Sequence, residues 1–181
     1  MPLTEATEYD IAEVSRQLGR PARDIAAIAA RCVCGNPVVV QTAPRLSNGE
    51  PFPTMYYLTH KGATAAISTL EASGYMAELQ AELGESEELG EAYRRAHASY
   101  LAERDELEAL LGLDVPEIDG ISAGGMPTRV KCLHALIGHS LAAGPGVNPI
   151  GDKALAACSW QPTKCQCDHT PNSAPNNPET L

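Results

Sequence analysis

A β-rich stretch lies between residues 37 and 59, and the segments on both sides of it carry helical patterns. The run NPVVVQTA is rich in β-branched residues, and TMYYLT alternates aromatic with polar residues. Between them, Ser47-Asn48-Gly49 has the residue types of a hairpin turn. We therefore predict one antiparallel β-hairpin, from about Pro37 to Thr59, in a mainly helical α+β fold. Prolines beside the turn would block pairing near its tip, so PRLSNGEPFP should be an exposed loop.

Helical patterns account for most of the remaining chain. The apolar content of 44% leans on alanine, with a single Trp and a single Phe, which favours closely packed helices. In the longest predicted helix, apolar residues recur at spacings of three, four and seven and form one buried stripe. That stripe consists of Leu89, Tyr93, Ala96, Tyr100, Leu107 and Leu111. Helices are predicted over about 7–18, 21–31, 61–73, 75–83, 86–111 and 131–141, with a short one around Leu155.

The chain of 181 residues has no internal repeat, which predicts a single globular domain over residues 1–158. From Ser159 onward Pro and Asn dominate and the apolar periodicity is lost, so we expect residues 159–181 to form a disordered tail. Its removal should then leave the stability nearly unchanged. Cys165, Cys167 and His169 could take up metal there, but the composition favours disorder.

A net charge of −10 disfavours nucleic acid or anionic membranes as the main partner, because both bind through clustered Lys and Arg. No run reaches the ~18 apolar residues of a membrane span, and the first ten residues are acidic where a signal peptide would be basic. We therefore expect a cytoplasmic protein that binds a protein partner or a small anionic ligand. Its six cysteines are then expected to be thiols or metal ligands rather than disulfides.

Cysteine and histidine residues suggest a metal site at the base of the hairpin. Cys32 and Cys34 directly precede the hairpin, and His60 directly follows it, so paired strands would bring them together. Cys132 and His134, from a later helix, would complete a set of sulfur and nitrogen ligands of the kind that zinc favours. No standard zinc-finger spacing is present, and the prediction depends on topology alone.

The helix predicted for KCLHALIGHSL restricts how Cys132 and His134 could bind the same metal. In an ideal helix Cys132 and His134 point about 200° apart, so they could share a metal only if Cys132 lies at a frayed helix start. The competing interpretation is a core cysteine on an ordinary helix with histidines on its flanks. His139 is expected to be a structural histidine or one that supports a metal ligand without binding the metal.

A second candidate site precedes that helix. Gly124 and Gly125 lie ahead of a predicted helix whose first turn carries Arg129 and Lys131, which are the ingredients of an anion site. Arg45 from the hairpin loop could also hold an anionic ligand. The glycines match no phosphate-binding motif, and a flexible turn before a basic helix start explains them as well.

Several motifs are similar to a known family. They are RCVCGNPVVVQTAPRLSNGEPFPTMYYLT and SAGGMPTRVKCLHALIGHSLAAGPGVNPIGD, joined by LEASG and AHASYLAERD. Together they resemble the bacterial uncharacterised proteins grouped as domain of unknown function 501, over most of residues 8 to 158. The resemblance implies a bacterial cytoplasmic protein and supplies no established activity. Its characteristic positions match Cys32, 44–46, 51–54 and 131–134. The resemblance implies that Cys is typical of the family where this chain has His60, and an exchange of Cys for His suits a zinc ligand better than a nucleophile.

Three functions remain open from the sequence. The first is a zinc-stabilised binding or scaffold domain, in which four ligands close the metal site. The second is a metal-dependent hydrolase that acts on a small phosphate-bearing substrate held by arginine or lysine. The third is an enzyme with Cys132 or Cys32 as nucleophile and a histidine as base. We favour the first, because the sequence has no HExxH motif and because His134 would point away from Cys132 in an ideal helix.

Overall fold

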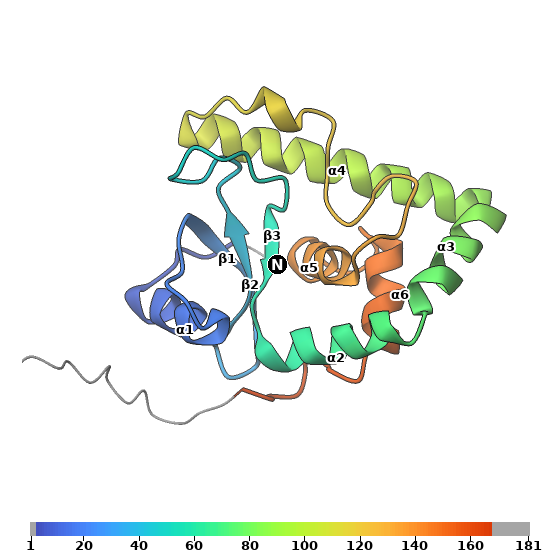
Figure 1. The fold of residues 1–181 in the computed structure, drawn as a ribbon, viewed down its shortest axis with the longest axis horizontal. Coiled ribbons are helices and arrows are strands. Elements are labelled where there is room, and N and C mark those ends of the chain that lie inside the picture. Colours follow the sequence, from blue (N-terminus) through green and yellow to red (C-terminus); the bar gives the residue numbers. More distant parts are fainter. Residues whose placement is uncertain (1–2, 168–181) are drawn as a thin grey trace, which may run out of the picture.

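The computed structural model describes residues 3–167, which form six α-helices, one short 3₁₀ helix and a three-stranded antiparallel sheet. The predicted α+β class is thereby confirmed (Figure 1). The elements are α1 (Glu8–Leu18), β1 (Ile25–Arg31), β2 (Pro37–Thr42), β3 (Tyr56–Leu58), α2 (Lys61–Ala72), α3 (Tyr75–Glu85), α4 (Glu87–Leu111), η1 (Pro116–Ile118), α5 (Leu133–Ala143) and α6 (Pro149–Ala157).

The strands lie in the order β1-β2-β3, and the predicted hairpin is the β2–β3 pair, with Val39 opposite Leu58 and Val40 opposite Tyr57. The helix predicted over residues 21–31 is wrong, because residues 25–31 form β1. All six residues of β2 are buried, so both of its edges need hydrogen-bond partners. Short β3 supplies one edge and β1 the other, and this pairing outweighs the helix preference of the alanines in β1.

Helices cover both faces of the sheet. On one face, Val14 of α1 packs against Ile28 and Val40 of the sheet in a small apolar cluster. On the other face lies α5, which is enclosed by β3, α2, α4 and α6 (Figure 1). Nearly every residue of α5 is buried, as expected for a central helix rather than an amphipathic surface helix. Among residues 3–167, no helix combines the length and hydropathy that crossing a membrane requires.

The long helix α4 follows the prediction closely. Ser86 caps it by accepting the N–H of Leu89, and Gly112 ends it in the left-handed conformation. The predicted stripe is buried from Leu89 to Leu107, while Leu111 is exposed at the last turn. The hairpin loop, predicted to be exposed over residues 44–53, is exposed at its tip over residues 47–51, while Pro44 is buried and a bridge pairs Arg45 with Pro51.

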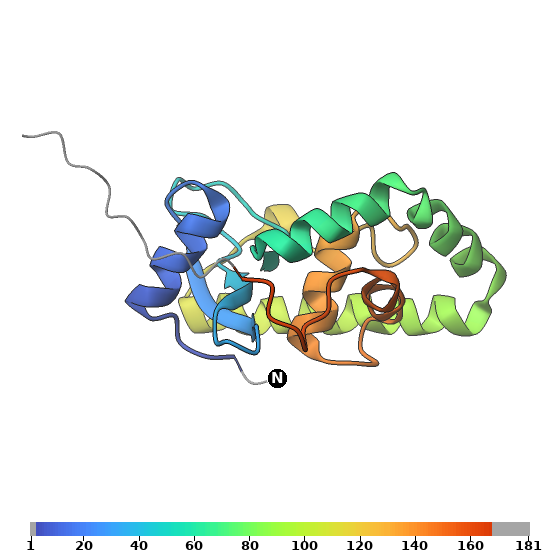
Figure 2. The same cartoon turned by 90° about the horizontal axis from the view of Figure 1, so that it is seen from below.

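The chain after α6 departs from the predicted tail. Residues 159–167 run from α6 below α2 toward the sheet (Figures 1 and 2), and Trp160 is 0% exposed. The packed part of the chain therefore extends at least to Cys167, past the predicted boundary at Ser159. The physical reason is the burial of one large aromatic side chain, which a composition argument overlooks. The remaining tail residues, with His169, lie outside the described residues.

Candidate metal centre

A tight turn between β1 and β2 carries Cys32 and Cys34. The N–H of Cys32 donates to the carbonyl of Asn36 at 2.8 Å, and the N–H of Gly35 donates to the carbonyl of Cys32 at 2.8 Å. Gly35 has φ of +94°, a conformation that residues with a Cβ rarely adopt. The turn therefore has a defined shape in which the two cysteine backbones are fixed by hydrogen bonds.

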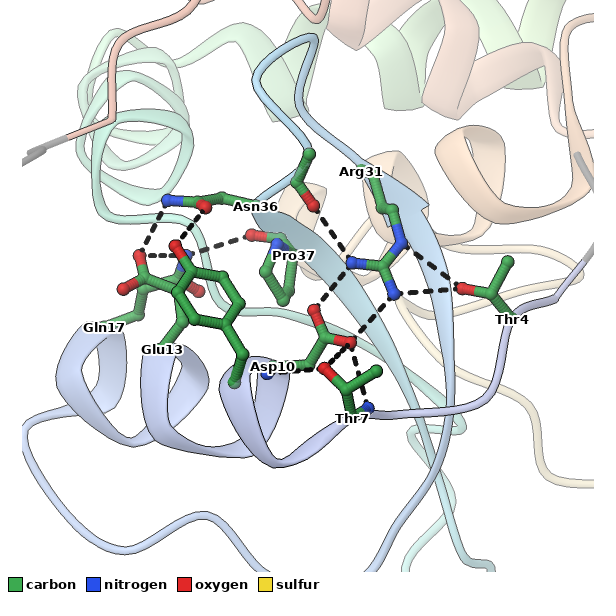
Figure 3. A network of polar contacts seen from close by, with 10 residues as sticks. Thr4, Thr7, Asp10, Glu13, Gln17, Arg31, Asn36 and Pro37 are labelled. Atoms are coloured by element: carbon green, nitrogen blue, oxygen red, sulfur yellow. Dashed lines mark hydrogen bonds and ion pairs between the residues drawn. The ribbon is translucent and has the colours of Figure 1, made fainter.

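A polar network ties this turn to α1 (Figure 3). The guanidinium of Arg31 donates to both carboxylate oxygens of Asp10, at 2.6 and 2.9 Å, and to the carbonyl of Gly35 at 2.9 Å. The Asn36 amide donates to Glu13 Oε1 at 3.2 Å. Hydrogen bonding from Arg31 lowers the pKa of the buried Asp10 carboxyl to about 2. The residues on both sides of the cysteine turn are thus anchored to the helix behind it.

The C-terminal segment brings a second pair of cysteines to the same point. The sulfur atoms of Cys32, Cys34, Cys165 and Cys167 all lie within 4.8 Å of one another. Cys34 Sγ and Cys167 Sγ are 3.4 Å apart. In a tetrahedral site with metal–sulfur bonds of about 2.3 Å, neighbouring sulfurs would be about 3.8 Å apart. Four cysteine side chains are therefore close enough to hold one metal ion.

His60 contacts this cluster without belonging to it. Its Nδ1 accepts the N–H of Ala63 at 3.1 Å, so the proton of the neutral ring is on Nε2, which lies 3.2 Å from Cys167 Sγ. The ring is almost fully buried and packs against Trp160, with ring centroids 5.4 Å apart. Burial lowers the pKa of His60, in keeping with a neutral ring. The predicted ligand His60 is therefore placed as a hydrogen-bond donor to a cysteine sulfur.

The structure separates the other two predicted metal residues from this cluster. Cys132 and His134 group with Glu71, their ligand-type atoms lying within 4.8 Å of one another, and that group does not include Cys32. The single predicted site thus divides into two clusters on different elements. Cys165 and Cys167 lie in the predicted tail and are absent from the predicted ligand set. Their CxC spacing, which repeats that of Cys32 and Cys34, is the sequence signal that could have identified them.

The predicted anion site has a different geometry from the one expected. The helix begins at Leu133, so Arg129 and Lys131 precede it and do not form its first turn. Their backbone N–H groups donate to the carbonyls of Gly125 and Gly124, at 2.9 and 2.8 Å. A side chain at Gly125 would come within 2.5 Å of the Arg129 carbonyl, so this glycine permits a close turn of the chain upon itself. The N–H groups of Arg129 and Lys131 are therefore engaged within the turn and are not available to an anion.

Arg45 is also engaged within the chain. Its guanidinium donates to Glu117 Oε2 at 2.6 Å and to the carbonyl of Gly49 at 2.9 Å. These contacts fasten the hairpin loop to the segment that follows α4. The structure therefore gives Arg45 an intramolecular partner in place of the predicted anionic ligand.

Comparison with known families places these features in context. The sequence profile of the family described as "Protein of unknown function (DUF501)" matches residues 28–156. The chain belongs to the DUF501 family. The match contains the first CxC pair and Cys132, and it ends before Cys165 and Cys167. No curated protein and no solved structure matches this DUF501 chain. Membership therefore supplies no activity, and any statement about function must come from the site itself.

Proposed function

We propose that this protein is a cytoplasmic, zinc-stabilised binding or scaffold domain. The observation that carries the proposal is the convergence of four cysteine sulfurs within 4.8 Å. Four thiolates would fill a tetrahedral metal site and leave no position for water or substrate. A site of that kind stabilises a structure and performs no chemistry.

Zinc is the metal that we propose, because closed sites with four cysteines are typical of structural zinc. A cluster of two or four irons would distribute its cysteines over separate irons, and some sulfur pairs would then lie further apart than 4.8 Å. A single iron would accept the same geometry. It would be recognised by its visible absorption, whereas a zinc site is colourless.

The zinc would join two parts of the chain that are distant in sequence. Cys34 and Cys167 are separated by 133 positions, and the Cys165–Cys167 segment has no regular secondary structure of its own. Closing so long a loop in the unfolded chain is entropically costly, so a metal that binds only the folded form would stabilise it substantially. The hydrogen bond from His60 to Cys167 would support the thiolate, as outer contacts do in many metal sites.

The binding part of the proposal rests on the exposed hairpin loop. Residues 47–51 are exposed at its tip, while Arg45 and Glu117 fasten its base. A protein partner is proposed to meet the domain there, because Arg45 is already paired with Glu117 and is not free for an anionic ligand. The alternative of a metal-dependent hydrolase gains no support from a site whose four ligands would all be cysteines.

Metal analysis of the unmodified protein and three variants tests the zinc proposal. Unmodified protein should contain close to one zinc per chain, and Cys34→Ser and Cys167→Ser should lose the zinc and several kcal/mol of stability. Cys158→Ala is the matched control, because Cys158 is a cysteine outside the cluster, and it should keep its zinc. If both serine variants retain a full complement of zinc, the site is elsewhere and the proposal is wrong.

A further inference from the structure

The N-terminal end of α5 carries a second cluster that the zinc proposal does not use. Cys132 is the N-cap residue, with φ of −153° and ψ of 109°, so its side chain is free of the directions that a helix imposes. It therefore meets His134, although the two would point apart in an ideal helix. Glu71, near the end of α2, completes a group whose sulfur, nitrogen and oxygen atoms lie within 4.8 Å of one another.

The hydrogen bonds of His134 identify its protonation state. Nε2 lies 3.2 Å from the carbonyl oxygen of Thr64, which can only accept a hydrogen bond, so Nε2 carries a proton. Nδ1 lies 3.3 Å from Glu71 Oε1, which already accepts the N–H of Leu133 at 2.6 Å. A ring with acceptors at both nitrogens is best satisfied as an imidazolium. Its positive charge would hold the neighbouring Cys132 as a thiolate.

The electrostatics agree with this geometry. The hydrogen bond with His134 lowers the pKa of Cys132, and the hydrogen bond with Cys132 raises the pKa of His134 to about 9. The Glu71 carboxylate raises the pKa of Cys132, because it disfavours a thiolate. It also raises the pKa of His134, because it favours an imidazolium. The N–H of Ala135, in the first turn of α5, also favours the thiolate.

A cavity of about 320 Å³ opens beside this pair. Cys132 and His134 line it, together with Tyr56, Tyr57 and Leu58 from β3. The lining that β3 supplies is thus largely apolar, and the cavity suits a small apolar chain better than a highly charged ligand. The N–H of His134 has no hydrogen-bond partner among residues 3–167 and lies in the same helix turn as the N–H of Ala135. Two donors in that position could stabilise an oxyanion next to the sulfur.

We propose that Cys132 is a nucleophile for activated acyl groups that bind in this cavity, with His134 as acid and base and Glu71 as a positioning residue. The Cys132 sulfur forms a bond to the acyl carbon of a thioester. The bond from that carbon to the leaving sulfur breaks, and the leaving sulfur keeps the electron pair of that bond. His134 then gives this sulfur a proton, so the leaving group departs as a thiol. Water then attacks the acylated cysteine and gives a proton to the now neutral His134. The carboxylic acid and the starting thiolate–imidazolium pair are released.

The reactivity of the thiolate is measured on the unmodified protein. Site-resolved mass spectrometry should follow the alkylation of Cys132 by iodoacetamide between about pH 5 and 9.5. Cys132 should react at neutral pH several-fold faster than an ordinary thiol, because its lowered pKa raises the thiolate fraction. His134→Gln should remove this advantage, and Glu71→Gln should reduce it, because the imidazolium of His134 then loses the carboxylate that favours its charge. His97→Gln, which alters a histidine bonded to Ser122 instead, should leave the rate unchanged.

The substrate class is tested with a butyryl thioester of N-acetylcysteamine. Acid quenching should trap a butyryl group on Cys132, and free thiol should be released in an initial burst. Cys132→Ser should form no adduct, with its melting temperature showing that it is folded. An ordinary alkylation profile at Cys132 would overturn the proposal. Fast alkylation of Cys132 without acylation would overturn the proposal that its substrate is an acyl thioester. A second zinc per chain that Cys132→Ser removes would show that the thiolate is a metal ligand instead.

Discussion

His134 and His139 lie on the same helix but differ in charge, because their surroundings differ. His139 is 0% exposed, stacked on the Tyr56 ring and bonded through Nδ1 to the Asn148 amide at 3.1 Å. Burial lowers the pKa of His139 to about 4. The hydrogen bond between His134 and Cys132 raises the pKa of His134 to about 9. At neutral pH one histidine is therefore a neutral core residue and the other a cation.

The buried neutral His139 should make the fold sensitive to acid. Between pH 6.5 and about 4 the unfolded chain binds a proton at this residue and the folded chain does not, so stability falls as the pH falls. The loss should reach up to about 3 kcal/mol. Urea unfolding of unmodified protein and of His139→Gln, at pH 7 and pH 4.5, measures it. The variant should lose less stability on acidification, and equal losses would show that His139 does not cause the effect.

At the scale of the element, the sequence predicts those helices and strands whose signals are local. Thr7 caps α1 and Gly19 ends it, Ser86 caps α4, and the alternation in TMYYLT identifies β3. The strand β1 could not be recognised in the same way, because IAAIAAR has the composition of a helix. Its conformation is imposed by β2, a fully buried strand that requires a partner on each edge.

The ion pair between Asp10 and Arg31 should account for much of the attachment of α1 to the sheet. The pKa of Asp10 is lowered to about 2, so its contribution is present at neutral pH and is lost as the pH falls from about 4 toward 2. Asp10→Asn should cost about 2 kcal/mol at pH 7. Urea unfolding provides the measurement, and Glu8→Gln is the control, since Glu8 is an exposed acidic residue in the same helix turn. A similar small loss in both variants would count against this role for the ion pair.

Over the whole molecule, the candidate metal centre depends on contacts that the sequence does not reveal. The strands bring the Cys32–Cys34 turn near His60, which the topology predicted. The second CxC pair reaches the same place because Trp160 anchors the segment between α6 and Cys165 in the core. A Pro-rich and polar composition gives no sign of that anchor, so the prediction stopped at Ser159.

Burial of Trp160 changes the expectation for truncation. Trp160→Ala should destabilise the protein by about 3–5 kcal/mol, the usual cost of removing a fully buried aromatic side chain. A chain that ends at Cys158 should lose at least as much, because it also lacks two cysteines of the cluster. Thr163→Ala, in an exposed part of the same segment, should leave the melting temperature unchanged. A Trp160→Ala variant as stable as the unmodified protein would show that this segment is not anchored in solution.

X-ray absorption at the zinc edge tests the proposed metal centre most directly. The purified protein should show a single shell of four sulfur atoms at about 2.3 Å from zinc, with Cys32, Cys34, Cys165 and Cys167 as their source. A shell containing nitrogen or oxygen would contradict a site closed by four cysteines. Absence of zinc from the purified protein would contradict the account altogether.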